Sequence, residues 1–141
     1  MKFRYKKYAP GLLRPVIPVE ILHKDIAVPC EVLVDSGADI CIFDAQIAEI
    51  LGIELKTGKE QKVAGLTGVS ESYYLHPVII SLGGWEYKIQ VGFLPSSGKF
   101  GYGVVGQKGF FDIFVVKFDL IKEEVEIRER AQTPRWNQGR Q

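Results

Sequence analysis

The sequence predicts an all-β protein, mostly antiparallel, with one or two short helices. Apolar, β-branched runs of strand length recur along the chain, and short polar or glycine-rich links separate them. The pair Gly83-Gly84 lies between two such runs, which is a strong signal for a tight hairpin turn. Residues 44–52 space their apolar side chains as a helix does. These observations together favour a small sheet protein that one or two helices partly cover.

The first two strands are predicted at residues 15–22 and 26–34. The polar link 23–25 between them has hairpin length. Three prolines lie in these runs and each removes a donor from a strand ladder, so we expect edges or bulges there. The prolines are Pro15, Pro18 and Pro29. The second strand leads directly into Asp35.

The first helix is predicted at residues 44–52. Asp44 is a residue type that caps helix N-termini, and Gly52 is a common helix stop. Ile47, Ile50 and Leu51 share one face, which is enough to cover part of a sheet.

The rest of the chain is predicted as strands and turns. Residues 61–74 resemble a more exposed hairpin with a glycine-flanked tip at 65–68, and residues 95–103 are loop by composition. Strands are expected at 73–82, 85–94, 113–120 and 125–130, and about one helical turn at 107–112.

The length of 141 residues is near the common size of one domain, and a chain of this length buries roughly 68–70% of its unfolded surface. We therefore expect one domain at residues 15–130. It is flanked by an N-terminal arm at 1–14 and a flexible C-terminal tail at 131–141.

The net charge of +1 gives no argument for a nucleic-acid partner. The densest basic group, Lys2, Arg4, Lys6 and Lys7, is interrupted by other residues and is interpreted as a solvated arm. No apolar stretch has the form of a secretion signal or reaches the ~20 residues of a membrane span, so we expect no membrane partner and a cytoplasmic location.

Cys30 and Cys41 are the only cysteines, and with His23 and His76 they match no metal-site spacing. Buried free thiols are the favoured state, because a reducing cytoplasm disfavours a disulfide between them. Both histidines are interpreted as structural or exposed. No metal and no cofactor are expected.

One motif carries the chemistry: residues 32–39 read Val-Leu-Val-Asp-Ser-Gly-Ala-Asp. An apolar strand delivers Asp35 onto a sharp turn, where Gly37 permits close approaches that a Cβ would block. A lone Asp-Ser-Gly is most often an ordinary surface turn. The order of the surrounding segments is more specific, because a helix, an exposed hairpin, a strand pair and then residues 103–106, Gly-Val-Val-Gly, follow it.

In this order the chain resembles the retroviral-type (retropepsin-like) aspartic proteases, over roughly residues 16–125. The resemblance implies a half-barrel fold and a homodimer. It also implies hydrolysis of peptide bonds by water activated between two Asp35 carboxyls. A second Asp-Ser-Gly or Asp-Thr-Gly does not occur in the chain, so an identical subunit would supply the second acid.

By the same resemblance, Asp35 is the catalytic residue, and Ser36 and Gly37 support the active site. Substrate would be bound by Gly37, Ala38 and Asp39, and by Gly65, Leu66 and Thr67 in the hairpin that corresponds to the family's flap. The expected partners are a peptide or protein substrate and a second copy of the chain.

The sequence departs from the viral enzymes where they commonly place an arginine, ion-paired to the acid matching Asp39. Here Gln107 occupies that position and Lys108 follows. Three alternatives remain open: Gln107 hydrogen-bonds Asp39, Lys108 replaces the arginine, or Asp39 is solvated. The segments outside 16–125 also give no clear copy of the viral terminal strands. A non-catalytic module that binds a peptide or partner on the same fold is the alternative function.

Overall fold

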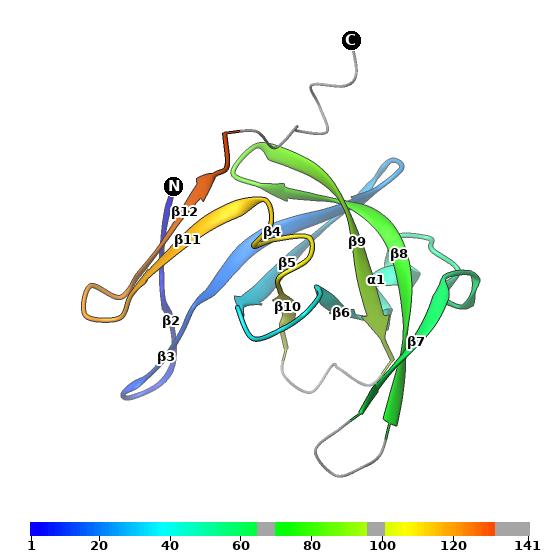
Figure 1. The fold of residues 1–141 in the computed structure, drawn as a ribbon, viewed down its shortest axis with the longest axis horizontal. Coiled ribbons are helices and arrows are strands. Elements are labelled where there is room, and N and C mark those ends of the chain that lie inside the picture. The colour runs from blue at the N-terminus through cyan, green and yellow to red at the C-terminus, as the bar shows by residue number, and fades with distance from the viewer. Residues whose placement is uncertain (65–69, 96–100, 132–141) are drawn as a thin grey trace.

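The computed structural model describes residues 1–64, 70–95 and 101–131, and its main feature is a seven-stranded sheet that closes on itself (Figure 1). Strand β4 pairs both with β5 and with β8, which closes six strands into a ring and leaves β7 outside it, paired with β8. The mostly antiparallel all-β fold is therefore confirmed. In spatial order the strands are β4 (Val16–His23), β5 (Ile26–Val34), β10 (Gly103–Val105), β6 (Ile42–Asp44), β9 (Trp85–Leu94), β8 (Ser70–Leu82) and β7 (Lys59–Ala64).

Two tight turns fix the register of the longest hairpins. His23 pairs with Ile26, so β4 and β5 are joined by a two-residue turn in which Lys24 has a φ of 52°. Between β8 and β9, Gly83 and Gly84 have φ values of 56° and 88°. Two successive positive φ angles match the turn that fits the twist of a hairpin. Both predicted hairpins are confirmed.

The predicted helix is also present, as α1 (Ala45–Ile50). The Asp44 side chain accepts a hydrogen bond from the Gln46 N–H at 2.8 Å, which satisfies one of the free donors at the helix start. Gly52, with a φ of 74°, ends the helix. A short 3₁₀ helix, η1 (Leu55–Thr57), follows before β7.

The core lies inside the closed sheet and under a second sheet built from the two ends of the described chain. This second sheet has the order β1 (Lys2–Arg4), β12 (Glu124–Glu129) and β11 (Phe114–Asp119). It contributes Phe114, Val125 and Ile127 to the core, where the Phe114 ring lies 5.3 Å from that of Tyr87. Other fully buried large side chains are Phe43, Phe93, Phe110, Ile17, Ile21 and Ile80.

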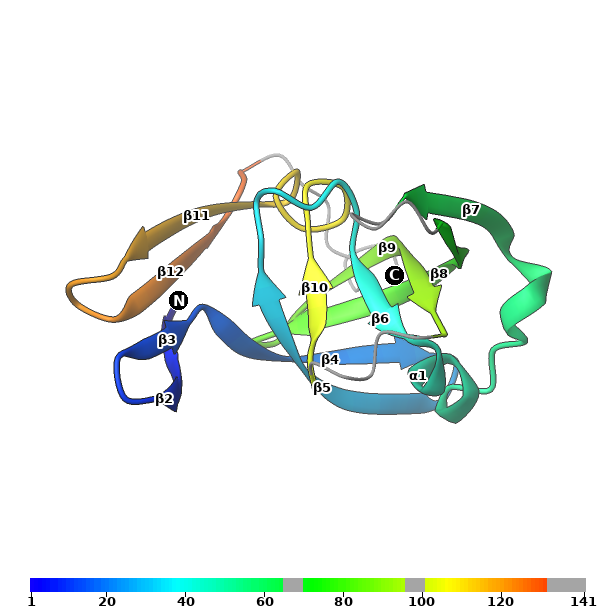
Figure 2. The same ribbon diagram turned by 90° about the horizontal axis from the view of Figure 1, so that it is seen from below.

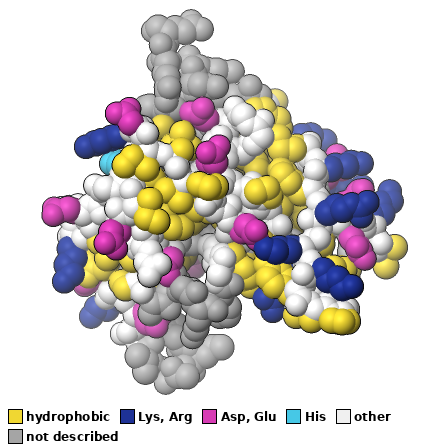
Figure 3. All heavy atoms as spheres, turned by 180° about the vertical axis from the view of Figure 1, so that it is seen from behind, with side chains coloured by type: hydrophobic (Ala, Val, Ile, Leu, Met, Phe, Trp, Pro, Cys, Tyr) yellow, Lys and Arg dark blue, Asp and Glu magenta, His cyan; other side chains and the backbone are white. Residues whose placement is uncertain are grey.

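Residues 1–14, which the sequence analysis described as an N-terminal arm, form short strands. Strand β1 pairs with β12 of the same chain, with Phe3 opposite Val125. Strands β2 (Lys6–Ala9) and β3 (Leu12–Arg14) form a separate hairpin that projects on the same side as the β11–β12 hairpin (Figure 1). Basic and acidic side chains mingle on that side (Figure 3), where Lys2 lies 3.9 Å from Glu124.

The helical turn predicted at residues 107–112 is wrong. Two consecutive wide turns occur there instead, with Phe111 N–H bound to Gly106 O and Asp112 N–H to Gln107 O. Gly109 has a φ of 98°, which a right-handed helix does not accommodate, and its N–H is bound by the Asp112 carboxylate at 3.0 Å. In the part of the chain that the structure describes, no helix has the length and apolar character needed to traverse a membrane.

Candidate active site

Asp35 lies directly after β5, at the point where β5 and β10 run side by side in parallel (Figure 2). Its backbone N–H donates to Val105 O at 3.0 Å, which ties the start of the turn to β10. The N–H of Gly37 donates to the Asp35 carboxylate oxygen Oδ1 at 2.9 Å. The half-buried Asp35 side chain is therefore held in one orientation by its own turn.

The segment after β10 holds the other side of this turn. Strand β10 lies between β5 and β6, so the chain from Asp35 to β6 wraps around its end (Figure 2). Gly106 packs so closely that a Cβ there would lie 2.5 Å from both Ala38 O and Ile40 O. Directly after it, Gln107 N–H donates to Ala38 O at 2.8 Å. The two motifs singled out in the sequence are thus in direct backbone contact.

The structure decides between the alternatives for Asp39. The Gln107 side chain donates from Nε2 to Ser36 O at 2.9 Å, and not to Asp39. Lys108 reaches Asp39 only through its backbone N–H, which donates to Asp39 O at 3.0 Å. Across residues 1–64, 70–95 and 101–131, no ion pair involves the exposed Asp39 carboxylate. The solvated alternative is the one that the geometry supports.

The two cysteines are free thiols, as expected. Cys41 is buried beneath the active-site turns, where its Sγ lies 3.5 Å from Gly106 N and donates to Lys108 O at 3.4 Å. Cys30 is half-buried on β5 and its thiol donates to Val28 O. Burial raises the pKa of each thiol to about 11, so both are neutral at ordinary pH and are poor nucleophiles.

The exposed hairpin predicted at residues 61–74 is present as the pair β7–β8. Its strands continue in antiparallel register up to Ala64 opposite Ser70. The expected substrate contacts Gly65, Leu66 and Thr67 lie outside the described residues, so their positions remain a prediction.

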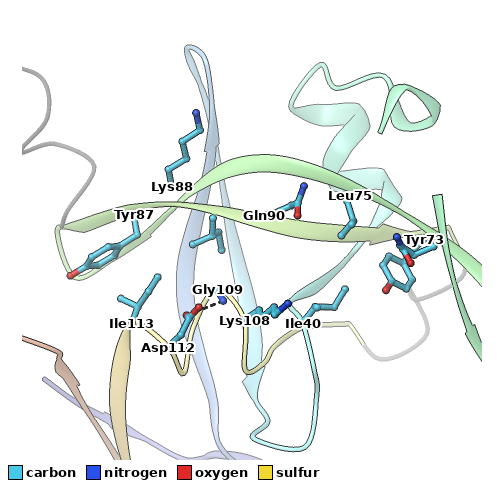
Figure 4. A pocket seen from close by; sticks show the side chains of 12 residues that line it. Ile40, Tyr73, Leu75, Tyr87, Lys88, Gln90, Lys108, Gly109, Asp112 and Ile113 are labelled. Atoms are coloured by element: carbon cyan, nitrogen blue, oxygen red, sulfur yellow. Dashed lines mark hydrogen bonds between the residues drawn. The ribbon is translucent and has the colours of Figure 1, made fainter. Parts of the chain in front are cut away.

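Two pockets adjoin the active-site turns. An open pocket of about 470 Å³ is lined by Ser36, Gln107, Lys108, Phe111 and Asp112. A second, of about 540 Å³, lies between the base of β7–β8, strand β9 and the turns at 108–113 (Figure 4). Ile40 and Lys108 reach it from the active-site side. Sequence reasoning placed no pocket here, because its walls come from segments far apart in the chain.

Neither histidine lines the two pockets beside the active-site turns. His76 is buried, its ring 5.9 Å from that of Phe93, and its Nε2 lies 2.7 Å from Leu55 O. Within the described residues, no three side chains of the types that hold metal ions gather in one place.

The mostly antiparallel, single-domain fold is that of the retropepsin-like aspartic proteases, and Asp35 lies on the turn that follows β5. The sequence model of the family described as aspartyl protease matches residues 17–108, and the chain belongs to this family. This confirms the resemblance inferred from the motifs.

Solved structures agree with the fold. A retropepsin-like aspartic protease from Rickettsia conorii matches with a TM-score of 0.63 and 16% identity, over 91% of this chain and 98% of that one. The EIAV protease, solved in complex with the inhibitor HBY-793, matches with a TM-score of 0.50 and 23% identity, over 67% of this chain and 82% of that one. A search of curated protein sequences gives no match.

Proposed function

We propose that two copies of this chain form an aspartic endopeptidase, in which Asp35 of each copy supplies one carboxyl of the catalytic pair. The sequence contains a single Asp-Ser-Gly turn. An isologous dimer brings the same residue of both copies to its two-fold axis, so symmetry can supply the missing acid. Membership of the aspartyl protease family and the shared fold support this proposal.

The proposed reaction needs one proton shared between the two carboxyls, because like charges at close range disfavour double ionisation. The ionised Asp35 takes a proton from water, and the water oxygen adds to the scissile carbonyl carbon. The protonated Asp35 of the other copy donates a hydrogen bond to the carbonyl oxygen. Proton transfer to the leaving nitrogen then accompanies cleavage of the C–N bond. Activity is expected at acidic to weakly acidic pH.

The proposed substrate is an extended peptide held by strand-like hydrogen bonds between the active-site turns and the β7–β8 hairpin. Gly37 O would accept from a substrate amide, and Ala38 and Asp39 would line the cleft. The exposed Asp39, which has no ion-pair partner in the described chain, is available for such a contact. The two free thiols are consistent with a reducing compartment, and we propose the cytoplasm.

The proposal depends most on the hydrogen bond from Gly37 N–H to Asp35 Oδ1, because it shows a carboxylate oriented by its turn. The direct test is Asp35→Asn, with Asp25→Asn as the matched control in the exposed turn between β4 and β5. A mixed peptide library is incubated with each variant from acidic to neutral pH. We expect cleavage by the wild type and by Asp25→Asn, and none by Asp35→Asn. Cleavage by purified Asp35→Asn would end the protease assignment.

Mixing the variants tests whether each site needs two chains. At concentrations where dimers are saturated, an equal amount of Asp35→Asn added to the wild type should lower activity to about half, through exchange into mixed dimers with one acid. Asp25→Asn added in the same way should not lower it. Unchanged activity after full subunit exchange would contradict the shared site. A wild type that binds peptides without cleaving them would instead indicate the binding module.

A further inference from the structure

The Ser36–Gly37 peptide group is held at both of its ends. Its N–H, which belongs to Gly37, donates to Asp35 Oδ1 at 2.9 Å. Its carbonyl oxygen, which belongs to Ser36, accepts from Gln107 Nε2 at 2.9 Å. Gln107, the peptide group and the Asp35 carboxylate therefore form one continuous chain of hydrogen bonds.

We propose that Gln107 is a positioning residue, which orients and polarises the Ser36–Gly37 peptide so that its N–H holds the Asp35 carboxylate. Hydrogen bonds in series strengthen one another, because a carbonyl that accepts a bond makes the N–H of the same peptide group a better donor. The orientation of the amide is unambiguous, since Ser36 O can only accept and Nε2 is the donor. The effect on catalysis rests on the proposed function, whereas the hydrogen-bond relay does not.

The backbone of Gln107 is fixed beside the active-site turn. Its N–H donates to Ala38 O at 2.8 Å, so Gln107 contacts the carbonyls on both sides of Gly37. The preceding Gly106 permits this, because its Cα lies against Ala38 O and Ile40 O, where a Cβ would clash. Gln107 thus reaches Ser36 O from a fixed backbone position.

The donor at this position is neutral, although charged side chains line the same pocket. Ser36 and Gln107 line an open pocket together with Lys108, Phe111 and Asp112. The Asp112 Oδ1 atom accepts from Gly109 N–H (Figure 4), and Lys108 uses its backbone N–H for Asp39 O. The Gln107 amide adds no charge beside the Asp35 carboxylate, whereas a cation there would lie one peptide group away from it.

The test uses Gln107→Met, which keeps the length of the side chain and removes the donor. Gln107→Lys restores a donor, and Gln46→Met makes the same change on the exposed face of α1, away from the site. The first readout is the Gly37 amide proton in an NMR spectrum of labelled protein. We expect an upfield shift in Gln107→Met, recovery toward the wild-type position in Gln107→Lys and no shift in Gln46→Met.

The second readout is steady-state cleavage. In Gln107→Met we expect kcat to fall about five- to tenfold, the size of one lost hydrogen bond, with KM and the melting temperature nearly unchanged. Gln107→Lys should recover part of kcat. An unshifted Gly37 amide in Gln107→Met overturns the relay, whether or not the protein cleaves peptides. If the Gly37 amide shifts in Gln107→Met but the wild type shows no protease activity, the relay is retained and only the proposed function is refuted.

Discussion

Gly106→Ala is the substitution whose effect the structure defines most directly. The added methyl would lie 2.5 Å from two backbone oxygens, those of Ala38 and Ile40. Neither oxygen is at the end of a flexible side chain, so the active-site turn or the segment after β10 must move by most of an ångström. Movement of this size weakens the hydrogen bonds from Gln107 N–H to Ala38 O and from Lys108 N–H to Asp39 O.

The expected loss of stability follows from these two effects. Insertion of a methyl into a packed site costs about 1–3 kcal/mol, and each weakened hydrogen bond costs about 0.5–1.5 kcal/mol. We expect the free energy of unfolding to fall by ~2–6 kcal/mol, the range that these terms give together. Activity should fall by about 100-fold, because a misplacement near 1 Å at the reacting group has that order of effect.

The assays are urea-induced unfolding and peptide cleavage, with Gly52→Ala as the control. Gly52 has a φ of 74° and open space around its Cβ position, so the cost of Gly52→Ala is backbone strain alone, about 1–2 kcal/mol. That control should retain activity, because Gly52 ends α1 far from the active-site turns. A Gly106→Ala protein within 0.5 kcal/mol of the wild type and with full activity would refute the argument that this contact is rigid.

Two further predictions concern buried groups. Removing the imidazole in His76→Ala leaves Leu55 O without its bond and opens space beside Phe93, so unfolding free energy should fall by about 2–4 kcal/mol in urea titrations. Burial raises the pKa of Cys41 from 9.0 to about 11, so the folded state binds the thiol proton more tightly than the unfolded state and loses stability as pH rises through this window. Relative to Cys41→Ala, the wild type should lose about 2–3 kcal/mol of unfolding free energy between pH 8 and pH 11, and a constant difference would contradict this burial effect.

The sequence predicts those parts of the fold that local chemistry determines. The hairpin turn at Gly83-Gly84 and the helix that begins at Asp44 are specified within a few residues, and both are confirmed. The helical turn at 107–112 is wrong because tertiary contacts decide that segment. A strand bridge between Ile40 and Lys108 and the positive φ of Gly109 hold it in wide turns.

The pairing of β1 with β12 could not be predicted either, because it also depends on tertiary contacts. Strand β12 was expected at residues 125–130, but β1 has no strong local signal and lies more than 120 residues earlier, with Lys2 opposite Glu126. The free N-terminal amine also reaches across to Ile127 O at 3.0 Å. Only the assembled core, against which Phe3 packs opposite Val125, makes this pairing favourable.

In the candidate site too, local features could be predicted from the sequence and contacts between distant segments could not. Asp35 and Gly37 were predictable because the turn that orients the carboxylate lies within three residues. The position of Gln107 could not be predicted, because its partner is a backbone carbonyl 71 residues earlier. Every residue has such a carbonyl, so the sequence does not indicate which one accepts the bond. Strand β10 brings the two segments together by inserting between β5 and β6. Gln107 is therefore linked to the carboxylate through one peptide group of the turn, and under the proposed relay substitutions at either end should change the same Gly37 amide signal.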